Sequence, residues 1–157
     1  MLSPRDELCR LTATEAVLRL KRREITPLDL IDAAARRIAE VEPAINALPT
    51  LCIERARAHA ERLMRGEGRE AEAEPGWLGG LPVAIKDLTD VAGVRTTYGS
   101  PIFRDHVPAN SHPLVERIDS MMSASARCAR PFGGCAKYTR GNHRRASSLT
   151  EETSTIR

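Results

Sequence analysis

The sequence predicts an α/β fold, and two observations support this class. The first third of the 157 residues carries three helical patterns with clear start signals. A short apolar run then follows Gly79-Gly80, and such a run is typical of a buried strand. Aromatic residues make up only 3% of the chain, so its core has to be built from Leu, Ile, Val and Ala.

Two of the helices have recognisable N-terminal caps. Thr12 followed by Glu15 has the spacing of a capping box, and a helix is expected over about residues 13–21. Thr26 is the expected N-cap of the next helix. Asp29 places a negative charge near the positive end of that helix. These signals predict where both helices begin, independently of tertiary packing.

The second and third helices each show one apolar face. The stripe of the second helix is expected to stop before Pro43, because proline disrupts a helix interior. It consists of Leu28, Ile31, Ala35, Ile38 and Val41. A third helical pattern covers roughly residues 51–64, and Gly66 lies beyond its end. Its apolar face consists of Ile53, Ala56, Ala60 and Leu63.

The chain then changes character. Residues 66–76 are small, charged and rich in helix breakers, so an exposed connection is expected, with Trp77 as a packing anchor at its end. Residues 81–85 are expected to form a buried strand. Residues 89–100 suit a loop, and residues 114–118 look like the opening of another helix.

Charge and apolar patterning narrow the possible partners and location. The formal net charge is +3, but residues 119–157 alone carry seven basic and three acidic side chains, +4, which leaves −1 for residues 1–118. The excess of basic side chains therefore belongs to residues 119–157 and does not indicate a nucleic-acid-binding surface on the folded part. No apolar stretch approaches the roughly 20 residues that span a bilayer, and the N-terminus lacks the apolar run of a secretory signal. We expect a cytoplasmic protein with no nucleic-acid and no membrane partner.

The four cysteines match neither a disulfide framework nor a zinc pattern. They are Cys9, Cys52, Cys128 and Cys135, and six residues separate the last two. Adding His143 gives a Cys-Cys-His set without the paired short spacings of a metal site. Ordinary reduced thiols are expected, and no metal ligand is assigned.

Three stretches carry a family resemblance. Residues 11–50 form the helical opening, and residues 79–101 read GGLPVAIKDLTDVAGVRTTYGSP. Residues 102–118 lead into the next helix. Together they resemble the N-terminal part of an amidase signature enzyme. The resemblance implies a helical hairpin followed by the first strands of a mixed sheet flanked by helices, incomplete in this sequence.

The resemblance also implies a chemistry. Family members cleave carboxylic amide bonds with a nucleophilic serine, a bridging serine beside a cis peptide bond, and a lysine, which matches Lys86. A lysine that serves as a base has to be neutral near pH 7, although the ordinary lysine pKa is about 10.4. We expect burial behind Pro82–Ile85 to favour the neutral amine. A small-molecule amide substrate is implied, and no metal or organic cofactor.

Other polar side chains near the lysine are expected to be structural. Asp87 and Asp90 are expected to support the loop rather than act as acids. Hydroxyl groups in the loop are expected to make structural hydrogen bonds, and they belong to Thr96, Thr97 and Ser100. His106 and His112 lie among prolines without partner spacing, and both are expected at the surface.

The resemblance divides the chain in two. Residues 1–118 match the N-terminal part of an amidase domain, whereas residues 119–157 form an unmatched, basic, Ser/Arg/Ala-rich tail, expected to be disordered or out of frame. Ser147-Ser148 and Gly133-Gly134 do not resemble the family's Gly/Ser core, so no serine is assigned. We expect a truncated chain, inactive alone. A genuine short variant with its own tail is the alternative to an out-of-frame tail. The alternative function is that of a non-enzymatic binding module using the basic tail.

Overall fold

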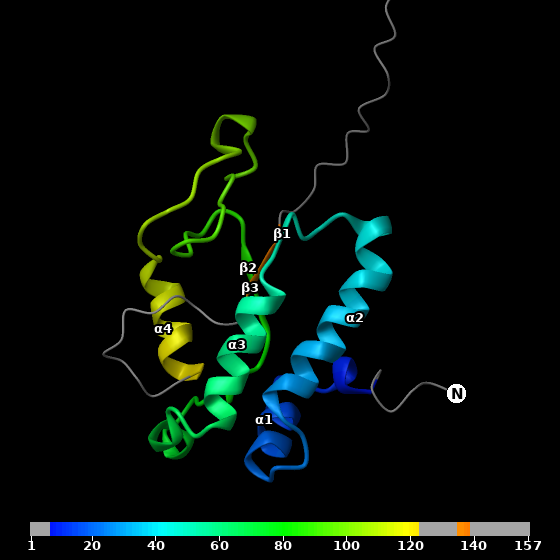
Figure 1. Ribbon diagram of the computed structural model, residues 1–157, viewed down its shortest axis with the longest axis vertical. Helices are drawn as coiled ribbons and strands as arrows, with labels where there is room; N and C mark the ends of the chain where they lie inside the picture. Colours follow the sequence, from blue (N-terminus) through cyan, green and yellow to red (C-terminus); the bar gives the residue numbers. More distant parts are fainter. Residues whose placement is uncertain (1–6, 123–134, 139–157) are drawn as a thin grey trace, which may run out of the picture.

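Four α-helices surround a small mixed sheet in the computed structural model, which describes residues 7–122 and 135–138 (Figure 1). The helices are α1 (Ala13–Lys21), α2 (Pro27–Ile45), α3 (Ile53–Met64) and α4 (Pro113–Met122). The strands are β1 (Thr50–Leu51), β2 (Val83–Lys86) and β3 (Cys135–Tyr138). Single 3-10 turns are η1 (Leu8–Arg10), η2 (Arg69–Ala73) and η3 (Pro101–Phe103). This arrangement confirms the α/β class, as a partial domain with few strands.

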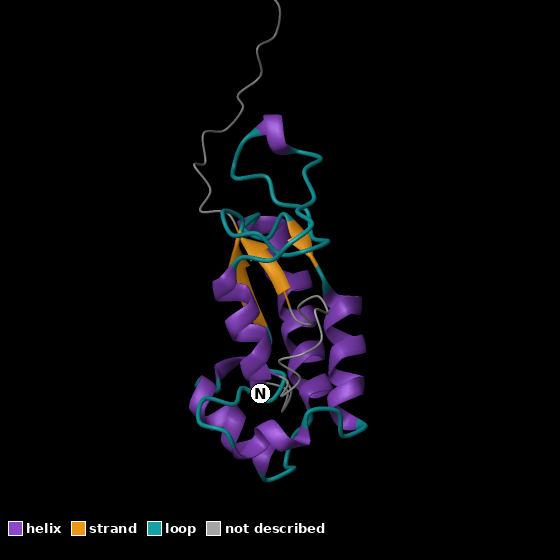
Figure 2. Ribbon diagram, turned by 90° about the vertical axis from the view of Figure 1, so that its left-hand side faces the viewer, coloured by secondary structure: helices purple, strands orange, loops and turns teal. Residues whose placement is uncertain are grey.

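The sheet has the strand order β1-β3-β2. β3 runs antiparallel to β1, with Thr50 opposite Lys137, and parallel to β2, with Lys86 opposite Tyr138. Figure 1 shows α2 and α4 on opposite sides of the strands, and Figure 2 shows loops gathered around one end of the sheet. The mixed sheet flanked by helices thus matches the expected architecture.

The expected tail falls largely outside the described residues. Residues 119–122 complete α4, and residues 135–138 form the central strand β3. These eight residues differ from the expectation of an unstructured tail, because their backbone is helical or paired with two neighbouring strands. Cys128 and His143 lie outside the described residues, so the Cys-Cys-His set has no structural account.

The capped helix starts are confirmed. α1 has the expected bounds, and the hydroxyl of Thr12 accepts a hydrogen bond from the Glu15 N–H at 3.2 Å. At the start of α2 the Thr26 hydroxyl accepts from the Asp29 N–H at 3.2 Å. The Asp29 carboxylate accepts from the Thr26 N–H at 2.9 Å in return. Each cap satisfies N–H groups that have no acceptor inside the helix.

The expected end of the second helix is wrong. α2 continues through Pro43 to Ile45. Pro43 removes its own intrahelical hydrogen bond, but only two helical residues follow it, so little of the helix depends on that bond. The helix ends instead at Asn46, whose φ of 49° is left-handed and whose N–H donates to the Glu42 carbonyl at 2.7 Å. Asparagine tolerates this conformation better than most residues, so it supplies the C-terminal stop.

The third helix begins two residues later than expected. Thr50 and Leu51 pair with β3 as the short strand β1, and α3 starts at Ile53. The apolar face of α3 is confirmed, since Ala56 and Ala60 are buried against Ile31 of α2. The local pattern around residues 50 and 51 does not indicate this strand, because its pairing partner lies more than 80 positions away.

The core consists of three small clusters rather than one. The first joins β2 and α4 through Ile85 and Val115, and the second joins α1 and α2 through Leu20 and Leu30. Trp77 packs against this second cluster, with its ring 5.7 Å from the Lys21 ammonium, which confirms its role as a packing anchor. The connection before Trp77 forms the single turn η2.

Among the described residues, no helix is both long enough and apolar enough to cross a membrane.

His59 is a histidine of α3 that is buried in the interior. Its side chain is 5% exposed, and Arg62 Nη2 lies 2.9 Å from its Nδ1. Because a guanidinium only donates, Nδ1 is the acceptor and the imidazole is neutral with its proton on Nε2. Burial, and then the positive charge of Arg62, lower the pKa of His59 to about 4. The fold therefore favours the uncharged ring.

We expect this histidine to make the fold sensitive to mild acid. A lowered pKa in the folded state means that the unfolded chain binds more protons between the two pKa values, so stability falls as the pH drops from about 6.5 toward 4. The full loss is at most about 3 kcal/mol. His59→Gln keeps an acceptor for Arg62 but does not titrate, so its urea-unfolding free energy should vary less over this range. The exposed Arg22→Gln removes a side chain that does not titrate in this range, so it is the control and should keep the wild-type slope. An unchanged slope in His59→Gln would contradict this account.

Candidate functional site

The candidate site lies where β2 ends. Along this strand the side chains alternate: Ile85 is 6% exposed, Lys86 is exposed and Asp87 is 0% exposed. Lys86 is the last residue of β2, next to the loop that follows. The expected burial behind Pro82–Ile85 is absent among the described residues, because strand alternation places the amine on the open side. Among the described residues, the Lys86 amine has no ion-pair or hydrogen-bond partner.

Asp87 holds the following loop against the end of the sheet. Its carboxylate accepts hydrogen bonds from the Thr97 N–H at 3.0 Å and from the Thr97 hydroxyl. Its carbonyl accepts from the Tyr98 N–H at 3.1 Å. A buried carboxylate is stable only when its oxygens are satisfied in this way. The expected supporting role of Asp87 is therefore confirmed.

Tyr98 forms a second anchor that the sequence pattern did not predict. Its φ of 51° is left-handed, and its hydroxyl donates to the Asp90 carboxylate at 2.5 Å. That hydrogen bond raises the pKa of Tyr98. Its ring stacks on His106 at 5.7 Å and meets Phe103 edge-on at 5.2 Å. The sequence offered one signal for this anchor: three ring side chains lie within nine positions of a chain that is otherwise poor in aromatic residues.

The remaining polar side chains of the loop are structural, as expected. The Thr96 hydroxyl donates to the Val94 carbonyl at 3.2 Å, and the Ser100 hydroxyl accepts from the Ile102 N–H at 3.3 Å. His112 is exposed as expected, and its Nδ1 accepts from the Leu114 N–H at 3.1 Å at the start of α4. His106 also lies at the surface, where stacking on Tyr98 leaves it half-exposed.

This arrangement can do limited chemistry by itself. It offers one accessible amine on a strand end, beside a loop in which the Asp87 and Asp90 carboxylates are already engaged in hydrogen bonds. An amine so placed can exchange a proton with a group brought next to it. Within residues 7–122 and 135–138, no three His, Cys, Asp or Glu side chains converge as a metal site requires.

The Asp87 carboxylate should be needed for the shape of the loop. Asp87→Ala leaves the Thr97 N–H and hydroxyl without their acceptor, and we expect it to destabilise the fold by about 1–3 kcal/mol. Urea unfolding measures this loss, and amide hydrogen exchange at Thr97 should quicken. Asp105→Ala is a matched control, because the Asp105 side chain is 92% exposed and pairs only loosely with Arg104 at 3.7 Å. Equal effects of the two substitutions would show that Asp87 is no anchor.

Comparison with known proteins places this strand and loop in a family context. A family model described as Amidase matches residues 29–121, which is more than half of the chain. The glutamyl-tRNA(Gln) amidotransferase A subunit of Anaeromyxobacter dehalogenans (strain 2CP-C) is 36% identical over 124 residues. The alignment covers 76% of this chain and 24% of that protein. Its counterpart of the same name in Roseiflexus sp. (strain RS-1) is 39% identical over 111 residues, covering 71% and 22%. The chain thus spans about a quarter of the length of these curated relatives.

Solved structures give the same picture. One is described as "An unexpected vestigial protein complex reveals the evolutionary origins of an s-triazine catabolic enzyme". It matches with a TM-score of 0.62 and 28% identity, over 82% of this chain and 25% of that chain. Fatty acid amide hydrolase matches with a TM-score of 0.61 over 87% of this chain and 22% of its own, and at 21% identity it supports the fold alone.

Proposed function

Because the chain belongs to the amidase family, we propose that Lys86 is the catalytic lysine of a hydrolase that cleaves carboxylic amide bonds. One observation carries this proposal. Lys86 lies inside the residues that the family model matches, at the end of a strand and beside a loop held by the buried carboxylate of Asp87. An accessible amine on such a rigid support suits proton transfer to a group positioned above it.

The proposed role of Lys86 is that of a general base. In its neutral form the amine takes the proton of a bridging serine, which in turn takes the proton of the serine that attacks the amide carbonyl. Low dielectric favours a neutral amine. Since Lys86 is exposed among the described residues, the groups that desolvate it have to come from the substrate or from protein packed over the end of β2.

The two serines and the oxyanion donors are separate requirements. This sequence contains no stretch resembling the family's Gly/Ser core, so we assign no serine and propose that these 157 residues alone hydrolyse no amide. Residues 1–118 are proposed to be the N-terminal part of an amidase domain that acts in the cytoplasm on a small-molecule amide. Neither a metal nor an organic cofactor enters this chemistry.

The role of Lys86 can be tested in an active context. We would replace the matching stretch of the Anaeromyxobacter amidotransferase protein with residues 11–118 and assay the chimera in that protein's own amidotransferase reaction. Lys86→Ala should lower kcat/KM by roughly 10²–10⁴-fold, the usual contribution of a general base. Lys86→Arg should lose as much, because a guanidinium stays charged and cannot act as a base.

Lys21→Ala is the matched control. Lys21 is the other lysine whose side chain the structure describes, and it lies over the Trp77 ring rather than beside β2. Its loss should leave kcat/KM within about twofold, since surface substitutions are usually close to neutral. An active chimera that tolerates Lys86→Ala would refute the catalytic assignment. No contact of the described residues favours the alternative of a binding module built on residues 119–157.

A further inference from the structure

A cavity between α2, α3 and β2 lies next to the candidate site, and we call it the α2–β2 cavity. Its volume is about 180 Å³. Its lining comes from α2, from the segment that joins α2 to α3, from the start of α3, and from residues 82–84. Segments far apart in the sequence therefore form this cavity together, and it exists only in the folded chain.

The wall of the α2–β2 cavity is almost entirely hydrocarbon. Four of its side chains are half-buried, so they keep surface that a ligand can touch: Ala34, Ile38, Leu48 and Ile53. Among the lining residues that the structure describes, Cys52 alone has a polar side-chain atom, and a thiol is only a weak donor. A polar or charged group would lose its water here without gaining a partner. The wall therefore favours an uncharged hydrocarbon group.

The size of the α2–β2 cavity fits one small ring. An engineered apolar cavity of about 150 Å³ in another protein stays dry and binds benzene. The present cavity, with about 180 Å³, has room for a group of the same size. Covering apolar surface contributes about 25 cal/mol for each Å² removed from water, so a ring can be held without any hydrogen bond.

Ala84 connects this cavity to the candidate site. Ile85 packs with Val115 of α4, so strand alternation turns Ala84 and Lys86 to the opposite side of β2. That is the side on which α2 lies (Figure 1). Ala84 is exposed and lines the cavity, and Lys86 follows on the same strand face, about 7 Å further along. The cavity and the amine thus share one face of β2.

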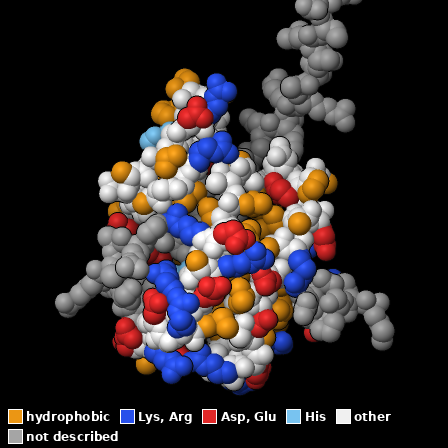
Figure 3. Space-filling view, viewed as in Figure 1, with side chains coloured by type: hydrophobic (Ala, Val, Ile, Leu, Met, Phe, Trp, Pro, Cys, Tyr) orange, Lys and Arg blue, Asp and Glu red, His pale blue; other side chains and the backbone are white. Residues whose placement is uncertain are grey.

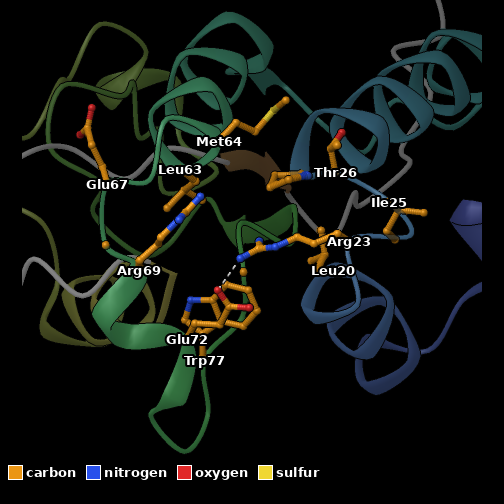
Figure 4. A pocket seen from close by; sticks show the side chains of 13 residues that line it. Leu20, Arg23, Ile25, Thr26, Leu63, Met64, Glu67, Arg69, Glu72 and Trp77 are labelled. Atoms are coloured by element: carbon orange, nitrogen blue, oxygen red, sulfur yellow. Dashed lines mark hydrogen bonds and ion pairs between the residues drawn. The ribbon is translucent and has the colours of Figure 1, made fainter.

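The cavity beside Trp77 has no comparable preference (Figure 4). Its lining includes two positive and two negative side chains, Arg23, Arg69, Glu67 and Glu72. Arg23 Nη2 lies 2.6 Å from the Glu72 carboxylate. Because these described charges balance, that cavity favours neither an anion nor a cation. The α2–β2 cavity differs from it in offering one kind of surface.

We propose that the α2–β2 cavity holds the hydrocarbon ring of a small uncharged amide, whose amide group lies toward Lys86. This inference rests on the proposed function of Lys86 and names the substrate class of that site. The ring covers the apolar surface of Ile38 and Leu48. The amide group extends past Ala84 along the open face of β2, toward the end of the strand. Amides with a charged group in place of the ring are selected against, because this wall cannot compensate for their lost water.

The test is an NMR titration of the full chain, labelled at its methyl groups and backbone nitrogens, with benzamide. Benzamide should shift the methyl signals of Ile38 and Leu48 saturably, together with the backbone N–H signal of Lys86. The methyl signals of Ile102, which is 86% exposed at the loop tip, are the internal control and should stay unchanged. Toluene has the ring without the amide and should shift the cavity methyls alone. Acetamide has the amide without the ring and should bind at least about tenfold more weakly, a difference of about 1.4 kcal/mol.

Two cavity variants and a matched control complete the test. Ala34→Leu fills the cavity from α2 and should weaken benzamide binding at least about tenfold, with an unchanged circular dichroism spectrum. Ala84→Val narrows the cavity from β2, where valine suits a strand, and should weaken binding as well. If Ala34→Leu does not fold, Ala84→Val decides. Ala39→Leu makes the same change at an exposed position of α2 outside the cavity lining and should bind as wild type.

Three outcomes would overturn the inference. They are the absence of saturable methyl shifts, wild-type affinity in the folded cavity variants, and benzamide binding that leaves the Lys86 signal unchanged. The titration measures binding and needs no catalysis, whereas the chimera assay measures the contribution of Lys86 to the reaction. A refuted catalytic role would therefore leave the methyl shifts in place, and a refuted cavity would leave the effect of Lys86→Ala in place.

Discussion

The alternation of side chains along β2 is the constraint on which the rest of the candidate site depends. Because successive residues of a strand face opposite sides, Ile85 and Asp87 point inward and Lys86 points out. The inward Asp87 then has to find donors, and it finds them on Thr97, ten residues further along. One buried carboxylate thus sets the path of the loop, and the same geometry leaves the amine accessible.

Hydrogen bonds between its two arms help to hold the loop that follows β2, beside the buried Val91 and Val94 at its base. The Gly93 N–H donates to the Pro108 carbonyl at 2.9 Å, and the Thr96 N–H donates to the His106 carbonyl at 3.0 Å. These bonds tie the two arms of the loop together, while its tip stays exposed. Ile102 at the tip is 86% exposed, and Figure 3 shows hydrophobic side chains among charged ones on this projecting end. The loop is therefore held at its base rather than packed along its length.

The two ends of the molecule differ in how much of a site the described residues provide. At the end of β2 they provide one amine on a rigid support, and every further group of the proposed reaction has to approach it. At the opposite end, α1, α3 and η2 line a cavity whose walls these elements supply, and the ion pair of Arg23 and Glu72 spans it (Figure 4). Chemistry at Lys86 therefore depends on further partners, whereas the walls of the cavity beside Trp77 come from these local elements alone.

The sequence by itself determined the starts of the first two helices, the α/β class and the family, because each rests on short patterns. Thr12 and Thr26 cap their helices through contacts three residues apart, and the segment around Lys86 is recognisable within some 20 residues. Only the tertiary structure decided the rest. Strand β3 between β1 and β2, the exposure of Lys86 and the Arg23–Glu72 ion pair all join residues far apart in the chain, or depend on which strand face is covered. Local propensity contains no information about such partners, since the contacts exist only once the chain is folded.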